Sequence, residues 1–126
     1  MRAWTIWLAV VAIAGMGVLV QGQVAAPGQA AQKTTPPEWV TTLIKTLEGE
    51  PVANPPARLA QYLYRGQTVY YLPPRCCDIP GTLYDVKGAV MCAPDGGFNG
   101  RGDGKCPDFF AERKNEQIIW RDTRRR

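Results

Sequence analysis

Residues 58–72 read RLAQYLYRGQTVYYL, and this stretch decides the fold. Its two halves, 59–63 and 68–72, are rich in aromatic and β-branched residues, which favour strands. Between them lies Arg65-Gly66-Gln67, whose glycine is suited to a turn. We therefore predict an antiparallel hairpin.

Downstream of this hairpin the chain predicts more strands and one long irregular segment. Residues 82–85 and 89–92 flank a turn at 86–88 and predict a second hairpin. The glycine-dense stretch 94–107 cannot form regular structure, and 117–121 is expected to return as a last strand.

Upstream of the hairpin, residues 35–48 predict one helix. The sequence 35–38, TPPE, matches a capping box, with Thr35 bonded to the amide of Glu38 and Pro36 at the first helical position. Gly49 ends the helix. Apolar residues recur at spacings of three and four, which makes one core-facing stripe of Trp39, Val40, Leu43, Ile44 and Leu47. The fold class is α+β: one amino-terminal helix packed on an antiparallel sheet of four to five strands.

Length and charge limit the function. The chain has 126 residues, 15 Lys+Arg against 11 Asp+Glu, and no histidine. The lack of histidine excludes Ser/His/Asp and Cys/His catalytic sites and histidine-ligated metals. Once Arg2 is removed with a signal, the remaining excess of +3 equals the charge of the three arginines at 124–126. The domain itself is neutral, so nucleic acid is not an expected partner.

The amino terminus resembles a secretory signal. Arg2 precedes an apolar run at 5–20, which is shorter than the ~20 residues of a straight membrane span. We predict a signal peptide at 1–22 with cleavage within 22–31, a flexible leader at 23–34, a single domain at 35–121 and a basic tail at 122–126. The protein is then secreted or periplasmic, and an uncleaved membrane anchor is the competing interpretation.

Export determines how the four cysteines are interpreted, because thiols meet an oxidising environment outside the cytosol. Cys76, Cys77, Cys92 and Cys106 are expected to form two disulfides. A bond between neighbouring Cys76 and Cys77 would close a strained ring, so two pairings stay open: 76–92 with 77–106, or 76–106 with 77–92.

Several short motifs carry a resemblance to a known family. They are CCD at 76–78, LYD at 83–85, Cys92 followed by PDGG at 94–97, GRGDGKCPDF at 100–109, and the upstream YLYRGQTVYY at 62–71. Over about 58–121 the chain resembles small exported bacterial proteins catalogued only as a domain of unknown function. The resemblance implies bacterial origin and export, and it brings no known activity, cofactor or catalytic residue.

The stretch 95–108 is the first candidate binding site. Carboxylates at Asp95, Asp103 and Asp108, with the Asn99 amide, are the oxygen ligands that Ca²⁺ takes. An EF-hand spacing fails, however, because Gly97 stands at its third position and Cys106 at its twelfth, so no metal or other cofactor is predicted. The tripeptide Arg101-Gly102-Asp103 resembles an integrin motif and is interpreted as part of a turn.

The tyrosines are the second candidate. Tyr62, Tyr64, Tyr70 and Tyr71 gather near one predicted hairpin and fall on both strand faces, so some are expected to point outward as a binding platform. The candidate binding residues are therefore Asp95, Asn99, Arg101, Asp103, Asp108, Tyr70 and Tyr71.

These features favour a non-catalytic binding or structural module outside the cytoplasm, since small disulfide-braced exported domains more often bind than catalyse. The partner is expected to be an extracytoplasmic protein, peptide or glycan, with membrane contact only if the signal stays uncleaved. Two alternatives are an inhibitor of an extracytoplasmic enzyme that presents the 94–108 loop, and a small metal-dependent hydrolase that uses its aspartates.

Overall fold

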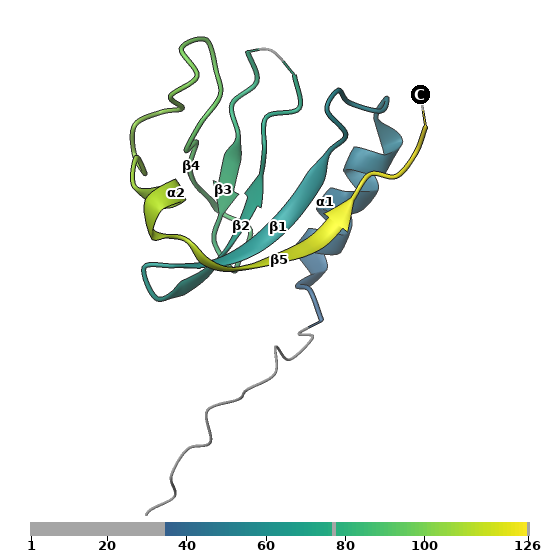
Figure 1. Cartoon of the computed structure of the whole chain (residues 1–126). Helices are drawn as coiled ribbons and strands as arrows, with labels where there is room; N and C mark the ends of the chain where they lie inside the picture. The colour runs from purple at the N-terminus through teal and green to yellow at the C-terminus, as the bar shows by residue number, and fades with distance from the viewer. Residues whose placement is uncertain (1–34, 77, 126) are drawn as a thin grey trace, which may run out of the picture. The chain divides into compact units, whose positions relative to one another are not determined.

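Two hairpins and a returning strand build one antiparallel sheet in the computed structural model, which describes residues 35–76 and 78–125. The predicted signal peptide, the leader and Cys77 lie outside the described residues. The chain order is α1 (Glu38–Gly49), β1 (Arg58–Tyr64), β2 (Gln67–Leu72), β3 (Thr82–Tyr84), β4 (Val90–Cys92), α2 (Phe109–Glu112) and β5 (Lys114–Arg121). The strand order in space is β4-β3-β2-β1-β5 (Figure 1). The predicted α+β class and both hairpins are confirmed.

Strand alternation gives the sheet two buried faces. Successive side chains of a strand point to opposite faces, so Tyr70 and Tyr71 enter different cores. The core that contains α1 is formed by Val40, Leu47, Leu59, Tyr70 and Leu72. The other is formed by Ala60, Tyr62, Tyr64, Val69, Tyr71, Leu83, Cys92, Cys106 and Phe109. Coverage of both faces explains why no tyrosine of the hairpin points outward: Tyr62, Tyr64, Tyr70 and Tyr71 are all 2–3% exposed, and that expectation was wrong.

Helix α1 begins later than the capping box predicts. Its N-cap is Pro37, in an extended conformation, and no side chain caps the helix. A proline disfavours the helical conformation in the residue before it, so Pro37 keeps Pro36 out of the helix, and Thr35 lies too far back to cap. The predicted capping box is therefore wrong, whereas the apolar stripe and the end of the helix at Gly49 are confirmed.

The turn between β3 and β4 is held against α1 by Trp39. The Trp39 ring packs against Tyr70 and Tyr84 at centroid distances of 5.1 and 5.4 Å, and its Nε1 donates to the Val86 carbonyl over 3.0 Å. Gly88 has a φ of +87°, and a Cβ placed there would lie 2.7 Å from the indole. This turn therefore requires glycine both for its backbone conformation and for space.

The end of the chain is attached to α1. The segment after β5 continues its pairing, with the Asp122 amide donating to the Ala57 carbonyl over 2.8 Å. Asp122 is 5% exposed and accepts hydrogen bonds from Arg124. Arg124 also donates to the carbonyls of Leu47 and Glu48 in the last turn of α1, a favourable position for a cation. Residues 122–124 therefore pack against the domain.

Both predicted disulfide pairings are wrong. The structure joins Cys92, the last residue of β4, to Cys106, with their Cα atoms 6.2 Å apart. Each predicted pairing places these two residues in separate bridges. The reason is spatial: the glycine-rich segment that follows β4 loops back onto the strand it left. None of the described cysteines is a free thiol.

Across residues 35–76 and 78–125, no helix has both the length and the apolar character needed to span a bilayer.

Candidate functional site

The segment between β4 and α2, residues 93–108, is the candidate site, and we call it the glycine-rich loop. It leaves the sheet at Cys92, and the disulfide to Cys106 closes it at its far end. In Figure 1 it rises beyond the end of β4 and comes back to α2, and its Cys106 belongs to the core on the face of the sheet opposite α1. Because both ends of the loop are fixed, the conformation of its middle depends on the hydrogen bonds that cross it.

Backbone hydrogen bonds cross the loop and hold it in shape. The amide of Asp103 donates to the Ala93 carbonyl over 2.9 Å, and the amide of Gly102 donates to the Gly96 carbonyl over 3.0 Å. The amide of Gly81, before β3, donates to the Asp95 carbonyl over 3.0 Å and ties the loop to the rest of the chain. The loop is thus folded back on itself and does not span its ends as an open arc.

Glycine is required where these backbones meet. Gly102 has a φ of +66°, and a Cβ there would lie 1.9 Å from the Ala93 carbonyl oxygen. Gly96 has a φ of +71°, and its Cβ would lie 2.7 Å from Pro74 and 2.8 Å from the Ile79 carbonyl oxygen. Any larger side chain at either position would separate the crossing segments.

Two predicted site residues serve as local turn caps. The Asn99 side-chain oxygen accepts from the Arg101 amide, and Asp103 Oδ1 accepts from the Lys105 amide, both over 3.0 Å. The hydrogen bond from the Lys105 amide holds the pKa of the exposed Asp103 carboxyl below its usual value. These contacts are the local turns typical of Asn and Asp, and the interpretation of Arg101-Gly102-Asp103 as part of a turn is confirmed.

The other two aspartates anchor the loop to tyrosines of the sheet. Tyr71 donates to Asp95 over 2.6 Å, and Tyr64 donates to Asp108 over 2.7 Å. Arg65 also pairs with Asp108 over 2.7 Å and, as the main cause, lowers the pKa of that carboxyl. Burial, with the hydrogen bond to Asp95, raises the pKa of the Tyr71 phenol.

The third tyrosine of this face follows the same pattern. Tyr62 donates to Glu116 of β5, and burial is the main cause that raises its pKa to about 12. Phe109 lies between Tyr62, Tyr64 and Tyr71, at centroid distances of 5.6, 5.4 and 5.3 Å. Arg113 packs over the Tyr62 ring at 4.8 Å. The cluster is a core with polar edges, and its tyrosines are unavailable to a ligand.

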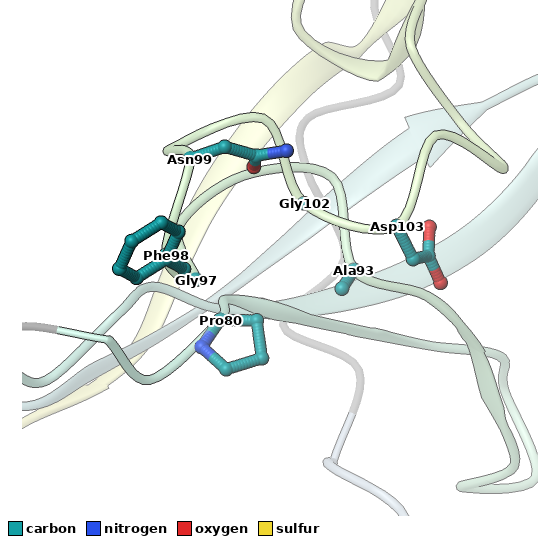
Figure 2. A pocket seen from close by; sticks show the side chains of 7 residues that line it. All are labelled: Pro80, Ala93, Gly97, Phe98, Asn99, Gly102 and Asp103. Atoms are coloured by element: carbon teal, nitrogen blue, oxygen red, sulfur yellow. The ribbon is translucent and has the colours of Figure 1, made fainter.

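Phe98 is the feature of the loop that the sequence analysis missed. It is 97% exposed, more than any other large apolar side chain of the described residues. It borders a surface hollow of about 320 Å³ together with Pro80, Ala93, Asn99 and Asp103. Figure 2 shows the Phe98 ring beside Gly97, with Asp103 on the far side of the hollow. The sequence does contain a signal for this exposure: Phe98 stands among Gly97, Asn99 and Gly100, which have no apolar side chains to cover it.

The predicted site residues do not converge. Asp95, Asp103 and Asp108 each bond a different partner, and Tyr70 lies on the opposite face of the sheet from Tyr71. Nowhere in the described part of the chain do three metal-ligating side chains meet. Arg101 and Phe98 are exposed at the tip of the loop. The arrangement can present a fixed surface to a partner.

A family model described as a domain of unknown function, DUF6970, matches residues 45–122. The match begins in α1 and ends one residue beyond β5, so it contains the whole sheet and the glycine-rich loop. No curated protein and no solved structure matches the chain.

Proposed function

The chain belongs to the DUF6970 family, a domain of unknown function, and from this premise we propose that it is an exported, non-catalytic binding module that inserts Phe98 into an apolar pocket of a partner protein. The observation that carries the proposal is a phenylalanine that is 97% exposed on a loop held by a disulfide and by crossing hydrogen bonds. Removing a large apolar side chain from water is favourable, and here only a partner that covers Phe98 can remove it from water.

Preorganisation of the loop supports this function. Ordering a flexible loop on binding costs free energy, and a loop that is already fixed avoids most of that cost. Here the crossing bonds at Gly102 and Asp103 lie within five residues of Phe98. Aromatic anchors of this kind commonly dominate the free energy of protein–protein binding.

Export is supported by the cysteine chemistry. The Cys92–Cys106 bridge closes the loop that presents Phe98, and structural disulfides persist in oxidising compartments. The apolar run at 5–20 supplies the signal that such a location requires. We therefore propose that the partner is an extracytoplasmic protein.

An inhibitor of an extracytoplasmic enzyme is the second candidate, because a fixed loop with one exposed aromatic ring is suited to occupy an active-site cleft. The metal-dependent hydrolase is less well supported, since Asp95, Asp103 and Asp108 are bonded to separate partners. Inhibition would appear as loss of the partner's turnover when the domain is added at equal concentration.

The test compares Phe98→Ala with Val90→Ala, a matched control, because Val90 is 65% exposed on β4, away from the loop tip. Both variants and the wild type are used to capture proteins from the native envelope and medium, and each captured protein is then purified and titrated. We expect Phe98→Ala to weaken at least one interaction about tenfold or more, as for other aromatic anchors, and Val90→Ala to leave it unchanged.

The proposal is wrong if every captured protein binds Phe98→Ala as tightly as the wild type. Neither substitution is expected to change the melting temperature, because both side chains are exposed. A loss of binding by Phe98→Ala can therefore be assigned to the contact.

A further inference from the structure

Two arginines face each other at the end of the sheet, far along the chain from the glycine-rich loop. Arg58 begins β1 and Arg121 ends β5, and they are direct partners in the register of that antiparallel pair. Residues paired in this way lie on the same face with Cβ atoms about 4.5–5.5 Å apart. Like charges at such positions destabilise a sheet, so the pair requires an explanation beyond folding.

No acidic side chain neutralises the pair. The nearest along the chain, Asp122, is held by Arg124, and Glu50 pairs with Arg75. All 11 acidic residues of the protein lie between Glu38 and Asp122. Among the described residues, none of them forms an ion pair or hydrogen bond with Arg58 or Arg121. The two guanidiniums keep their donors available.

The space beside the pair has stiff apolar walls. Arg58 and Arg121 line a hollow of about 380 Å³ together with Pro55, Pro56, Pro73 and Pro74. Ala57 and Asp122 complete the lining, and the Asp122 carboxylate is held by Arg124. Proline fixes its own φ and has no backbone amide, so these walls are rigid and offer no hydrogen-bond donor. The polar selectivity of the hollow therefore depends chiefly on the two guanidiniums, and its volume lies near the lower end of the range for small-molecule sites.

We propose that Arg58 and Arg121 bind a small organic oxyanion, a carboxylate or a phosphate ester, whose apolar body contacts the four prolines. Guanidinium groups match both anions with paired hydrogen bonds. The anion would also relieve the repulsion between the two arginines. This site shares no residue with the hollow at Phe98, so it stands or falls independently of the proposed function.

Titration of the isotope-labelled protein with benzoate, phenyl phosphate and phenol, followed by NMR, tests the proposal. We expect benzoate, phenyl phosphate or both to bind with a dissociation constant of about 1 mM or below, with shifts centred on Ala57, Arg58 and Arg121. The tighter of the two identifies the anion. Phenol supplies the same ring without a full charge and is expected to bind at least about tenfold more weakly.

Matched substitutions separate this site from general attraction to a basic protein. Arg58→Gln and Arg121→Gln are each expected to weaken binding about tenfold or more, whereas Arg101→Gln, which removes one charge from the loop tip, is expected to leave it unchanged. Circular dichroism checks that each variant is folded. The shift map of the wild type needs no variant and tests the location directly.

Reversal of one charge provides a second readout. Arg121→Glu would place a carboxylate opposite Arg58, so the melting temperature without ligand should rise while anion binding is lost. A lower melting temperature together with unchanged anion binding would show that the pair is structural and would overturn the proposal. So would the absence of any saturable shift near Arg58, or equal binding of phenol and benzoate.

Discussion

At the scale of single residues, the hydrogen bond from Tyr71 to Asp95 fixes the glycine-rich loop to the sheet. The tyrosine is 3% exposed and donates to Asp95 Oδ2, while Asp95 Oδ1 is buried without a hydrogen-bond partner among the described residues. A buried carboxylate with one satisfied oxygen depends strongly on that bond. The contact therefore contributes both to stability and to the position of the loop.

Replacement of this phenol tests its contribution. Tyr71→Phe is expected to lower the free energy of unfolding by about 1–3 kcal/mol, because it leaves both Asp95 oxygens without a donor. Tyr70→Phe is the matched control: Tyr70 is equally buried, on the other face, and its hydroxyl has no hydrogen-bond partner in the described structure. Urea unfolding measures both, and equal losses would contradict the assignment.

Acid should weaken the link between Arg65 and Asp108. Arg65 lowers the folded-state pKa of Asp108 below its ordinary value of 3.8, so the ionised carboxylate is favoured in the folded protein. The resulting stabilisation is complete above the unfolded-state pKa and is lost as the pH falls through the folded-state value. Asp103 and Asp122, whose pKa values are also lowered, act in the same range.

Arg65→Gln should therefore flatten the fall of melting temperature with pH below about 4 and lower the melting temperature at neutral pH. Arg101→Gln is the control, because Arg101 has no ion pair in the described structure. Parallel pH profiles for the wild type and Arg65→Gln would show that the pair contributes nothing, as holds for many exposed ion pairs.

At the scale of elements, the turn between β3 and β4 couples the second hairpin to α1. Gly88→Ala introduces a Cβ at a positive φ and against the Trp39 ring, so we expect a loss of about 1–3 kcal/mol in the free energy of unfolding. Gly49→Ala is the matched change at the end of α1, where nothing lies within 4 Å, and it should be neutral or stabilising by up to about 1 kcal/mol. Thermal and urea unfolding measure both changes in the free energy of unfolding. A neutral Gly88→Ala would contradict the prediction, because it would show that the turn can move away from Trp39 at no cost.

The elements also show where sequence patterns suffice. Alternation and turn residues predicted the hairpin of β1 and β2, and a three- and four-residue spacing predicted the buried stripe of α1. The start of α1 was missed because consecutive prolines override a capping pattern. Helix α2 has four residues, too few for any periodicity, and it exists because Phe109 is buried among three tyrosines.

The candidate site was only partly predictable. Its glycines and aspartates identified the loop, but they could not show that each aspartate serves a different neighbour, since those neighbours lie on separate strands. The disulfide pairing failed for the same reason, because the return of the loop to β4 is a long-range contact. Phe98 was overlooked because exposure follows from the path of the whole loop.

At the scale of the whole molecule, the Cys92–Cys106 bridge closes a segment with a sequence separation of 14. Simultaneous replacement of both residues by serine should lower the free energy of unfolding by about 3 kcal/mol in the chain-entropy view. Peptide mapping of the oxidised protein should recover the 92–106 linkage. A map that links Cys92 to Cys76 or Cys77 instead would contradict the fold of the loop.

The glycine-rich loop separates the residues that hold its shape from those that face outward. Gly96, Gly102 and the disulfide define the backbone path, whereas Phe98 and Arg101 make no side-chain bond that the path requires. Substitutions of these two tip residues can therefore alter recognition while the domain stays folded. The domain is in this respect a ready framework for directed evolution, in which a library confined to 98 and 101 would vary specificity while the melting temperature stays nearly constant.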